Sequence, residues 1–415
     1  MSSSLPSGLM GFLLILILLV PLMGNAGGVD EFIITYWCGP PLKETTLERY
    51  KEIKDAGFNI GFVSIDGAFK KEDNLRLLDI AKEVGLKCII ADQRLTWDIA
   101  SKPNWEKIVD EVIKDFSSHP ALYGYYITDE PNASHFPLLA KVVSYIKEKD
   151  PKHIAFINLF PNYATPEQLG TPTYKDHVDL FVRTVKPQLL SYDYYTFLQG
   201  GDRDTFFENL RVIKEASERA RIPFIVIIQM VTHGPYRDLT KGEIAWQAYN
   251  CLAYGAKGIS YFTYWTPPDD PVWHYRNGII SWDGKRTAHY EEVKEVNNEV
   301  KVLGDFLNKL RSIDAYHMGK VPKGGKPLPE GTPIKGIEGG DATLGFFKDK
   351  NRTIYCLVVN MDYRNSRDFR IYTERKPKLF NPKMRKWGDV SFKKEKGAGY
   401  FQLTLPPGGG VLLRF

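Results

Sequence analysis

Two adjacent carboxylates, Asp129 and Glu130, close an apolar run at Leu122–Pro131 (LYGYYITDEP). Neighbouring side chains of a strand point to opposite faces, so we expect one of the two acids to face inward. Glu130 has the longer reach, and the neighbouring acid and tyrosines favour a raised pKa for its carboxyl. Such a group can serve as a general acid near neutral pH. The alternative is a pair of acids that cap the following helix.

A third acid, Asp193, closes another apolar run, Leu190–Tyr195 (LSYDYY). It lies among hydroxyls and aromatic rings rather than on an amphipathic helix. We therefore expect Asp193 to serve as a base or a charge stabiliser opposite Glu130. The alternative is an acid that binds a hydroxyl group or orients a tyrosine.

Polar and aromatic side chains also close the other apolar runs or follow them directly. The candidates for ligand contact are Asp129, Trp37, Asp66, Asp92, Arg94, Asn158, Tyr195, Gln229, His233 and Trp265. Further rings at similar positions are Trp97, Tyr163, Tyr194, Tyr236 and Trp273. Flat rings cover the C–H faces of a sugar, while acids and amides bind its hydroxyls. This combination predicts a carbohydrate ligand.

Short apolar runs alternate with amphipathic helical stretches from residue 31 onward. The runs are Phe32–Trp37, Ile60–Ile65, Leu86–Ala91, Leu122–Ile127, Ile154–Phe160, Leu189–Tyr195, Pro223–Gln229 and Gly258–Trp265. Glycines such as Gly57, Gly85 and Gly255 precede several runs, as expected after a helix C-terminus. Eight strands alternating with helices predict a (β/α)8 TIM barrel over residues 29–318. A doubly wound sheet is the competitor, but no Gly-rich phosphate loop follows an early strand.

The carboxyl ends of the strands in such a barrel meet on one rim, so the candidate residues are predicted to lie close together. A long helix near His289–Ile313 closes the ring, and residues 319–340 are rich in Gly, Pro and Lys and indicate a linker. Residues 341–415 alternate with period two and predict a small C-terminal all-β domain, similar to a sandwich. We expect this domain to be structural, because its strands carry no cluster of acids.

Residues 1–26 have the features of a signal peptide: the apolar run Gly11–Met23 is followed by Gly24-Asn25-Ala26. We expect a secreted or periplasmic protein with no membrane segment in the mature form; an uncleaved anchor is the alternative. The 415 residues carry a net charge of +5 without a basic block, which argues against a nucleic-acid partner. The four cysteines show no CxxC spacing, and Cys88 and Cys251 fit core positions.

The sequence resembles the clan A glycoside hydrolases in its order of elements, its acid-Glu pair closing strand four and its Trp closing strand eight. The segment Ala248–Pro267 (AYNCLAYGAKGISYFTYWTP) is similar to the corresponding part of family 42 β-galactosidase-like proteins. This resemblance implies that Glu130 is the acid/base. The clan usually has Asn before that Glu, where this chain has Asp129. The clan's nucleophile, a Glu closing strand seven, corresponds to Gln229.

A glutamine cannot form a glycosyl-enzyme ester, so this nucleophile does not carry over to the chain. Asp193 is the leading replacement, because strands four and six end very roughly 9–10 Å apart. Carboxyls about 6.5–9.5 Å apart leave room for a water and favour inversion, and about 5 Å favours retention. A substrate-assisted route is a further option, since Asp129-Glu130 resembles the acid pair of hexosaminidase barrels. Tyr192-Asp193 has a loose parallel in chitinase-like barrels.

We therefore expect a glycosidase that cleaves an extracellular oligo- or polysaccharide, with no cofactor and with Gln229 contacting the sugar. One alternative is a catalytically silent carbohydrate-binding barrel, which the replacement of the nucleophile favours. The other is a metal-dependent barrel enzyme, in which acids and an imidazole surround a divalent ion. Its candidate ligands are Asp66, Asp92, Glu130, Asp193 and His233.

Overall fold

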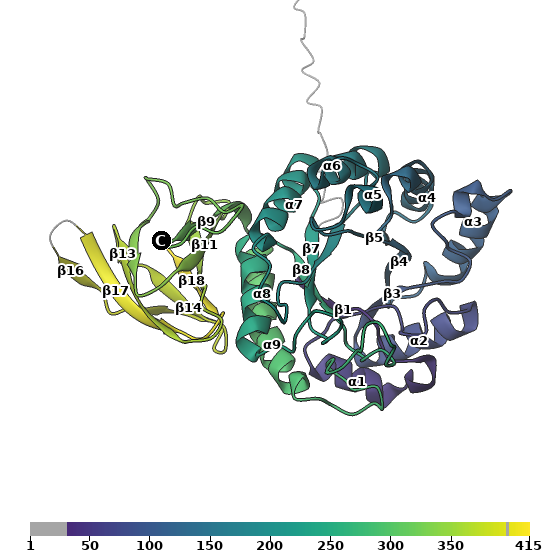
Figure 1. The fold of residues 1–415 in the computed structure, drawn as a ribbon, viewed down its shortest axis with the longest axis horizontal. Helices are drawn as coiled ribbons and strands as arrows, with labels where there is room; N and C mark the ends of the chain where they lie inside the picture. Colours follow the sequence, from purple (N-terminus) through teal and green to yellow (C-terminus); the bar gives the residue numbers. More distant parts are fainter. Residues whose placement is uncertain (1–30, 396–397) are drawn as a thin grey trace, which may run out of the picture.

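A computed structural model describes residues 31–395 and 398–415 of the chain. The signal peptide expected over residues 1–26 lies outside the described residues. Eight parallel strands form the first sheet, surrounded by helices in a (β/α)8 barrel (Figure 1). These strands are β1 (Ile33–Tyr36), β2 (Ile60–Gly61), β3 (Lys87–Ile90), β4 (Leu122–Asp129), β5 (Ile154–Leu159), β6 (Leu190–Tyr194), β7 (Phe224–Gln229) and β8 (Gly258–Phe262). The barrel predicted from the sequence is confirmed.

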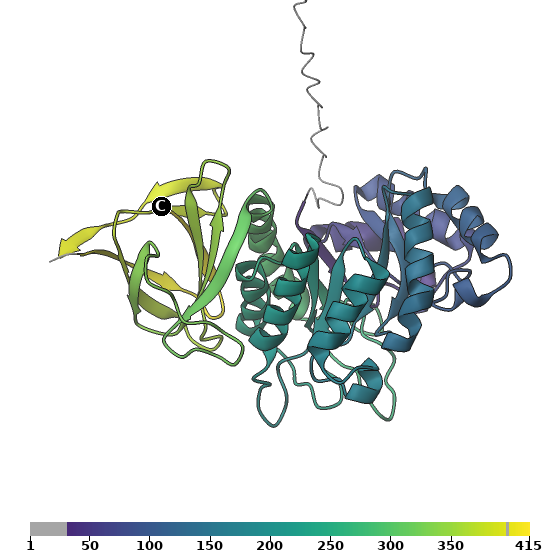
Figure 2. The same ribbon diagram turned by 90° about the horizontal axis from the view of Figure 1, so that it is seen from above.

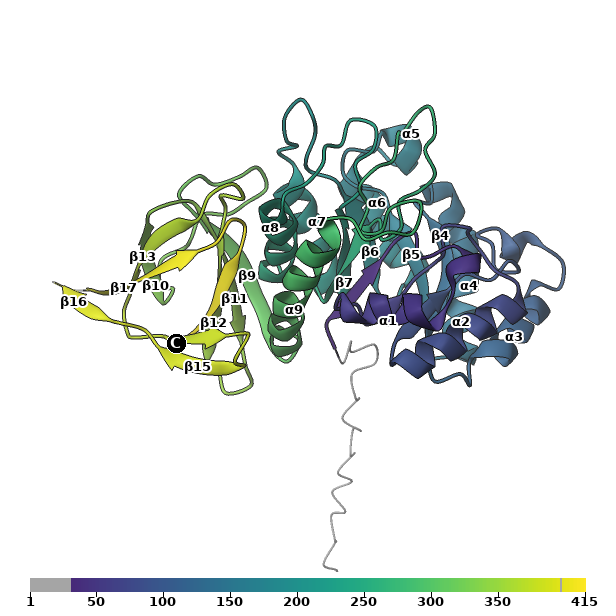
Figure 3. The same ribbon diagram turned by 90° about the horizontal axis from the view of Figure 1, so that it is seen from below.

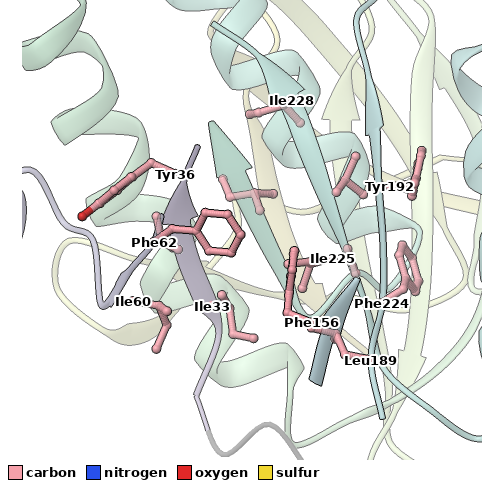
Figure 4. Packing of buried hydrophobic residues seen from close by; sticks show 14 of the residues in the cluster. Ile33, Tyr36, Ile60, Phe62, Phe156, Leu189, Tyr192, Phe224, Ile225 and Ile228 are labelled. Carbon is pink, nitrogen blue, oxygen red and sulfur yellow. The ribbon is translucent and has the colours of Figure 1, made fainter. Parts of the chain in front are cut away.

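The strands follow one another around the barrel in chain order from β2 to β8, and β8 pairs with β1. The ring closes between β1 and β2 through an isolated parallel bridge of Gly39 to Ser64. Apolar side chains from several strands fill the interior (Figure 4), and the rings of Phe62 and Phe156 lie 5.0 Å apart between centroids. This packed core fixes the strand ends that carry the candidate residues.

Helices cover the outside of the barrel, one or more after each strand. They are α1 (Leu47–Asp55), α2 (Lys71–Val84), α3 (Trp105–Phe116), α4 (Phe136–Lys149), α5 (Pro166–Leu169), α6 (Tyr174–Val185), α7 (Phe206–Ala220), α8 (Lys241–Ala253) and α9 (His289–Leu307). Helix α2 ends at Gly85, whose φ of 73° is left-handed, as predicted for a glycine after a helix. Short 3-10 turns are η1 (Leu42–Glu44), η2 (Ile99–Ser101) and η3 (Ala133–His135).

Two antiparallel sheets form the C-terminal β domain and enclose their own apolar core. One sheet has the order β10 (Ile334–Glu338), β13 (Arg367–Thr373), β17 (Ala398–Leu405) and β16 (Lys393–Glu395). The other has the order β15 (Lys386–Asp389), β14 (Lys378–Asn381), β18 (Gly410–Arg414), β12 (Ile354–Asn360), β11 (Ala342–Lys348) and β9 (Arg311–Met318). An all-β domain after the barrel is confirmed.

The β domain begins earlier in the chain than the sequence suggested. Strand β9 pairs with β11, so residues 311–318 belong to the second sheet, although we expected the barrel to extend to residue 318. Strand β10 lies inside the expected linker, residues 319–340, and pairs with β13. The sequence of β9 carries Arg, Ser, Asp and His between its apolar residues, and therefore shows no clear period of two.

The β domain packs against the barrel wall near α8, as the ribbon shows from two directions (Figures 1 and 2). Every residue of α8 from Glu243 to Ala253 is buried, because the barrel covers one face and the sheet of β11 and β12 the other. At Gly345 the approach is so close that a Cβ atom would lie 2.4 Å from the carbonyl oxygen of Ala253. The strand therefore requires glycine there.

None of the helices in residues 31–395 and 398–415 is long and apolar enough to span a membrane. All four cysteines are free, and Cys88 and Cys251 are buried as expected of core residues.

The loops that follow the barrel strands gather at one end of the barrel (Figure 3).

Candidate functional site

A cavity of about 350 Å³ opens at the carboxyl ends of the barrel strands. Acids, two amides, an imidazole and many aromatic rings share its walls. The lining residues are Trp37, Asp129, Glu130, Asn158, Phe160, Pro161, Tyr163, Ala164, Gln168, Asp193, Tyr195, Ile227, His233, Tyr236, Phe262, Trp273 and Tyr275. Its volume lies in the range of small-molecule sites, and its position is that of the active sites of barrel enzymes.

Asp129 and Glu130 both line this cavity, although strand alternation predicted only one of them there. Glu130 has a φ of 42°, in the left-handed region that residues other than glycine rarely adopt. This turn breaks the alternation of the strand and brings the second carboxyl back to the same side. The Glu130 amide donates to the carbonyl oxygen of Asn158 at 2.9 Å, which holds the turn in place. Strained backbone of this kind gathers at functional sites.

Asn158 connects the carboxyls of two strands. Its Nδ2 donates to Asp129 Oδ1 and to Asp193 Oδ1, each at 3.0 Å. Its Oδ1 accepts from the Ser191 hydroxyl at 2.9 Å, which fixes the orientation of the amide. Asn158 therefore lines the cavity as predicted, but both protons of its amide nitrogen are used to hold the acids.

Glu130 and Asp193 also form a hydrogen bond between their carboxyl groups. Burial, and then the charge of Asp129, raise the pKa of Glu130 to about 7. Burial and the charges of Glu130 and Asp129 raise the pKa of Asp193 well above its usual range. Two carboxyls in contact cannot both ionise easily, so the pair keeps a proton near neutral pH.

Asp129 is accessible from the cavity, yet protein surrounds it closely enough that desolvation raises its pKa to about 6. The hydrogen bond from Asn158 acts in the opposite direction and limits the rise of this pKa. At pH 7 Asp129 is therefore mostly ionised, next to a pair that is still partly protonated.

The contact between Glu130 and Asp193 differs from the expected geometry. Strand spacing favoured a gap with room for a water molecule between these carboxyls, and the reach of the side chains left a shorter separation open. The left-handed turn at Glu130 and the bridge through Asn158 bring the side chains together, so the gap is absent in this arrangement. Strand spacing describes backbone positions, and the side chains of both residues reach toward the barrel axis.

Aromatic rings from four strand ends form the remaining walls. Tyr195 stacks on Phe262 with 5.1 Å between ring centroids and an angle of 29°. On the opposite side Trp37 packs against Phe62 at 4.8 Å. Trp273, on the loop after β8, is 43% exposed and is the ring with the most open surface at the mouth. Such surfaces fit the C–H faces of sugar rings.

His233 is a neutral imidazole in the cavity wall. Its Nδ1 donates to the carbonyl oxygen of Val231 at 2.9 Å, which leaves Nε2 as the acceptor. Burial lowers the pKa of His233 to about 4. The ring packs against Tyr236 at 4.5 Å and Tyr275 at 5.5 Å. His233 can therefore accept a hydrogen bond from a ligand hydroxyl. It lies in the cavity wall, and the sequence places it among the candidates for ligand contact.

Gln229 does not contact the cavity, which contradicts the expectation that it binds the sugar. Its side chain is fully buried: Oε1 accepts from the Phe197 amide at 2.8 Å, and Nε2 donates to the carbonyl oxygen of Phe197 at 2.9 Å. Nε2 also donates to the carbonyl oxygen of Arg237 at 3.3 Å. The rings of Tyr195 and Phe262, from the strands on either side of β7, stack in front of this position.

Four other candidates lie outside the cavity wall, and the structure corrects their expected role. Asp92 is buried in an ion pair with Arg94, which also binds Asp115 of α3. These residues therefore hold the loop after β3 rather than a ligand. Asp66 accepts from the Leu42 amide at 2.7 Å. Trp265 is only 1% exposed, because the loop after β8 folds back over its ring.

Several lining residues were not among the sequence candidates, namely Phe160, Phe262, Tyr275, Ile227 and Gln168. The place of Phe262 in the cavity wall was predictable in principle, because Phe262 ends β8 at the level at which Gln229 ends β7. Tyr275 lies in a long loop, where no periodic pattern indicates the direction of a side chain.

Among the described residues no group of three or more His, Cys, Asp or Glu side chains is arranged to hold a metal ion.

No protein-family model matches the chain, and no curated protein matches it either. Solved structures share its fold. The β-galactosidase from Bacillus circulans sp. alkalophilus has a TM-score of 0.62 at 10% identity, with 93% of this chain and 99% of that chain covered. A catalytic mutant of Gan42B, a GH42 β-galactosidase from G. stearothermophilus, has a TM-score of 0.61 at 8% identity, with 93% and 98% covered.

The β-galactosidase from the psychrophilic Marinomonas ef1 has a TM-score of 0.51 at 13% identity. That match covers 67% of this chain and 62% of the Marinomonas protein. The structural neighbours thus include GH42 β-galactosidases, as the sequence resemblance predicted. At these identities the likeness concerns the fold, a TIM barrel followed by a β domain.

Proposed function

We propose that this protein is a glycoside hydrolase with Glu130 as the general acid, acting on an extracellular oligo- or polysaccharide. The observation that carries the proposal is the hydrogen-bonded pair of Glu130 and Asp193 in a cavity lined by aromatic rings. A carboxyl with a pKa of about 7 retains its proton near neutral pH and can protonate a glycosidic oxygen. The extracellular location rests on the apolar segment Gly11–Met23.

The cavity walls support a carbohydrate substrate. Trp37, Tyr195 and Trp273 offer ring faces, while Asp129 and His233 offer acceptors for hydroxyl groups. Similar folds in β-galactosidases favour a β-linked galactoside as the first substrate class to test. A ring held between aromatic walls keeps its glycosidic oxygen in a fixed position, which is the geometric condition for proton donation.

Asp193 acts in this proposal through its contact with Glu130. Because the two carboxyls touch, Asp193 does not stand across the sugar ring from the acid. Its own raised pKa lets it share a proton with Glu130, and the charge of the pair stabilises the oxocarbenium-like transition state after the proton has moved. Asp129 is the remaining carboxylate of the cavity wall and is the candidate base for the attacking water.

Replacement of the acid tests this function. We expect Glu130→Gln to lower kcat at least ~100-fold on a natural oligosaccharide, because an alkoxide leaving group needs the proton. On a p-nitrophenyl glycoside the loss should be much smaller, since nitrophenolate leaves without protonation. Product release would be measured on purified full-length protein with a panel of plant, algal and mucin glycans.

Asp66→Asn provides the matched control, because Asp66 is a carboxylate of the same barrel end that lies outside the cavity wall. This variant should retain the wild-type kcat. Near-normal turnover of a natural glycan by Glu130→Gln would exclude Glu130 as the acid.

A catalytically silent carbohydrate-binding barrel is the second candidate. It is favoured by Gln229, which stands where the resemblance places a nucleophile and whose side chain is fully bound to backbone groups. In that case wild type and Glu130→Gln would bind the same glycans in affinity electrophoresis, and neither would release product.

A further inference from the structure

The loop after β6, residues 195–205, separates the cavity from the junction between the barrel and the β domain. Its residue Arg203 contacts three residues of the cavity wall, two of them through their rings. The guanidinium lies 3.8 Å from the ring centroid of Tyr163 and 5.2 Å from that of Tyr236. It also donates to the carbonyl oxygen of Tyr195 at 2.8 Å and to the Tyr236 hydroxyl at 3.3 Å. The position of this loop therefore determines the shape of the wall.

The barrel holds the start of the loop through Phe197. Gln229 binds both the amide and the carbonyl oxygen of Phe197, and the Arg237 amide also donates to that carbonyl oxygen at 3.2 Å. The segment from Gln199 to Asp202 lies beyond this anchor and is exposed. Two contacts join it to the segment after β7: the Gln199 amide donates to the carbonyl oxygen of Pro235 at 2.9 Å, and Arg237 pairs with Asp202 at 3.3 Å.

The β domain adds an anchor of its own through Tyr363, which follows β12. The Tyr363 hydroxyl donates to Asp202, and its ring packs edge-on against Phe197 with 5.3 Å between centroids. The turn that carries Tyr363 is itself held, because Asp362 accepts from the amides of Arg364 and Asn365 at 2.9 Å. A cavity of about 730 Å³ at the junction is lined by the loop on one side and by this turn on the other.

We propose that Tyr363 is a positioning residue through which the β domain holds the β6 loop, and with it the ligand-binding wall of Tyr195, Tyr163 and Tyr236. The effect on catalysis rests on the proposed function, whereas the hold on the loop does not. Tyr363 acts through Phe197 and Asp202 and is not itself a lining residue of the cavity at the strand ends. The β domain thus contributes to binding as well as to stability.

Hydrogen exchange of the full chain tests the hold on the loop. In Tyr363→Ala we expect the amides of residues 196–203 to exchange at least ~10-fold faster, while residues 129–135 on the opposite wall remain unchanged. Tyr363→Phe keeps the ring contact and loses the bond to Asp202, so it should give a smaller increase. Tyr372→Ala is the matched control, because the Tyr372 hydroxyl likewise binds a carboxylate. Its partner is Glu338, which lies within the β domain and away from the loop.

Kinetics on p-nitrophenyl β-galactoside, or on the glycoside of the panel that wild type cleaves fastest, tests the effect on binding. Tyr363→Ala should raise KM at least ~5-fold, with kcat within twofold of wild type and an unchanged pH profile. A general loss of folded protein would instead lower kcat at constant KM.

Unchanged exchange in residues 196–203 of both variants, or an unchanged KM, would overturn the proposal. If wild type cleaves no glycoside, the proposed function is refuted. Hydrogen exchange alone then tests whether Tyr363 holds the loop.

Discussion

The hydrogen bond between Glu130 and Asp193 controls when each carboxyl can carry charge. Asp193 is more deeply buried than Glu130, and burial is the largest cause of the raised pKa of both groups. The first proton is therefore lost near the raised pKa of Glu130, about 7, and the second leaves only at higher pH. Below the first step Glu130 carries the proton that a general acid needs.

The pH dependence of kcat/KM should reflect Asp129 and Glu130. Below about pH 6 Asp129, the candidate base, gains a proton, so activity should fall as the pH decreases. Above about pH 7 Glu130 loses its proton and the acid is lost, so activity should fall again. We expect a bell-shaped profile with its acid limb near pH 6 and its alkaline limb near pH 7, measured on a soluble glycoside in buffers of constant ionic strength.

The charge of Asp129 raises the pKa of both members of the pair, so its removal gives a directional check. In Asp129→Asn the alkaline limb of the residual activity should move to lower pH, whereas Asp66→Asn should leave it in place. An optimum near pH 4 to 5 in wild type, the range of ordinary carboxyls, would contradict the raised pKa values.

Strand β7 and the loop after β6 are connected by the side chain of one residue, Gln229. A carboxamide fits this position because it accepts from one backbone amide and donates to two carbonyl oxygens. A carboxylate cannot donate. The glutamine therefore has a structural reason to be at the end of β7 that is independent of any catalytic role.

Gln229→Glu should therefore destabilise the fold without creating a nucleophile. The new carboxyl would face the carbonyl oxygens of Phe197 and Arg237 in a fully buried site, so its folded pKa would be raised. The loss should be small near pH 4, where the carboxyl stays protonated, and should grow to about 1–3 kcal/mol as the pH rises to 7. Urea unfolding at both pH values would measure it.

The same substitution at an exposed glutamine, Gln93→Glu, is the control and should change stability little. A gain of hydrolytic activity in Gln229→Glu would contradict the structure, since it would require this side chain to reach the sugar.

At the scale of elements, the barrel was predictable because its strands are continuous apolar runs with polar residues at their carboxyl ends. The site was predictable where a residue at the end of a strand lines the cavity, as Asp193 and Asn158 do. Glu130 was chosen for its reach, but the turn that places it beside Asp129 depends on a left-handed backbone angle that no local pattern indicates.

The loops limited the prediction of the site. Trp265 closes a strand like Trp37, yet only Trp37 reaches the cavity, because a long loop folds back over Trp265. Whether a residue at a strand end meets solvent, ligand or another loop is decided by contacts between segments far apart in the chain. Such contacts leave no periodic signal in the sequence.

At the scale of the whole molecule, α8 joins the two domains. The helix is buried all around, as expected of a helix with little polar surface that lies between two packed layers. Glycines allow the close approach: besides Gly345, a Cβ at Gly242 would lie 2.2 Å from the carbonyl oxygen of Tyr363. The junction that supports Tyr363 is therefore a tightly packed interface rather than a flexible connection.

This packing predicts the effect of a single methyl group at the junction. In Gly345→Ala the new Cβ would lie 2.4 Å from the backbone oxygen of Ala253, so β11 or α8 must shift. We expect a loss of about 1–3 kcal/mol in the free energy of unfolding, measured by urea denaturation. Gly388→Ala is the matched control: Gly388 also lies in a strand of the β domain, and the nearest atom to its Cβ would be 3.9 Å away. A domain that only rests loosely on the barrel would tolerate both substitutions equally.

If the interface is as rigid as the structure indicates, Gly345→Ala should also speed hydrogen exchange in residues 196–203, because the shift displaces the domain that carries Tyr363.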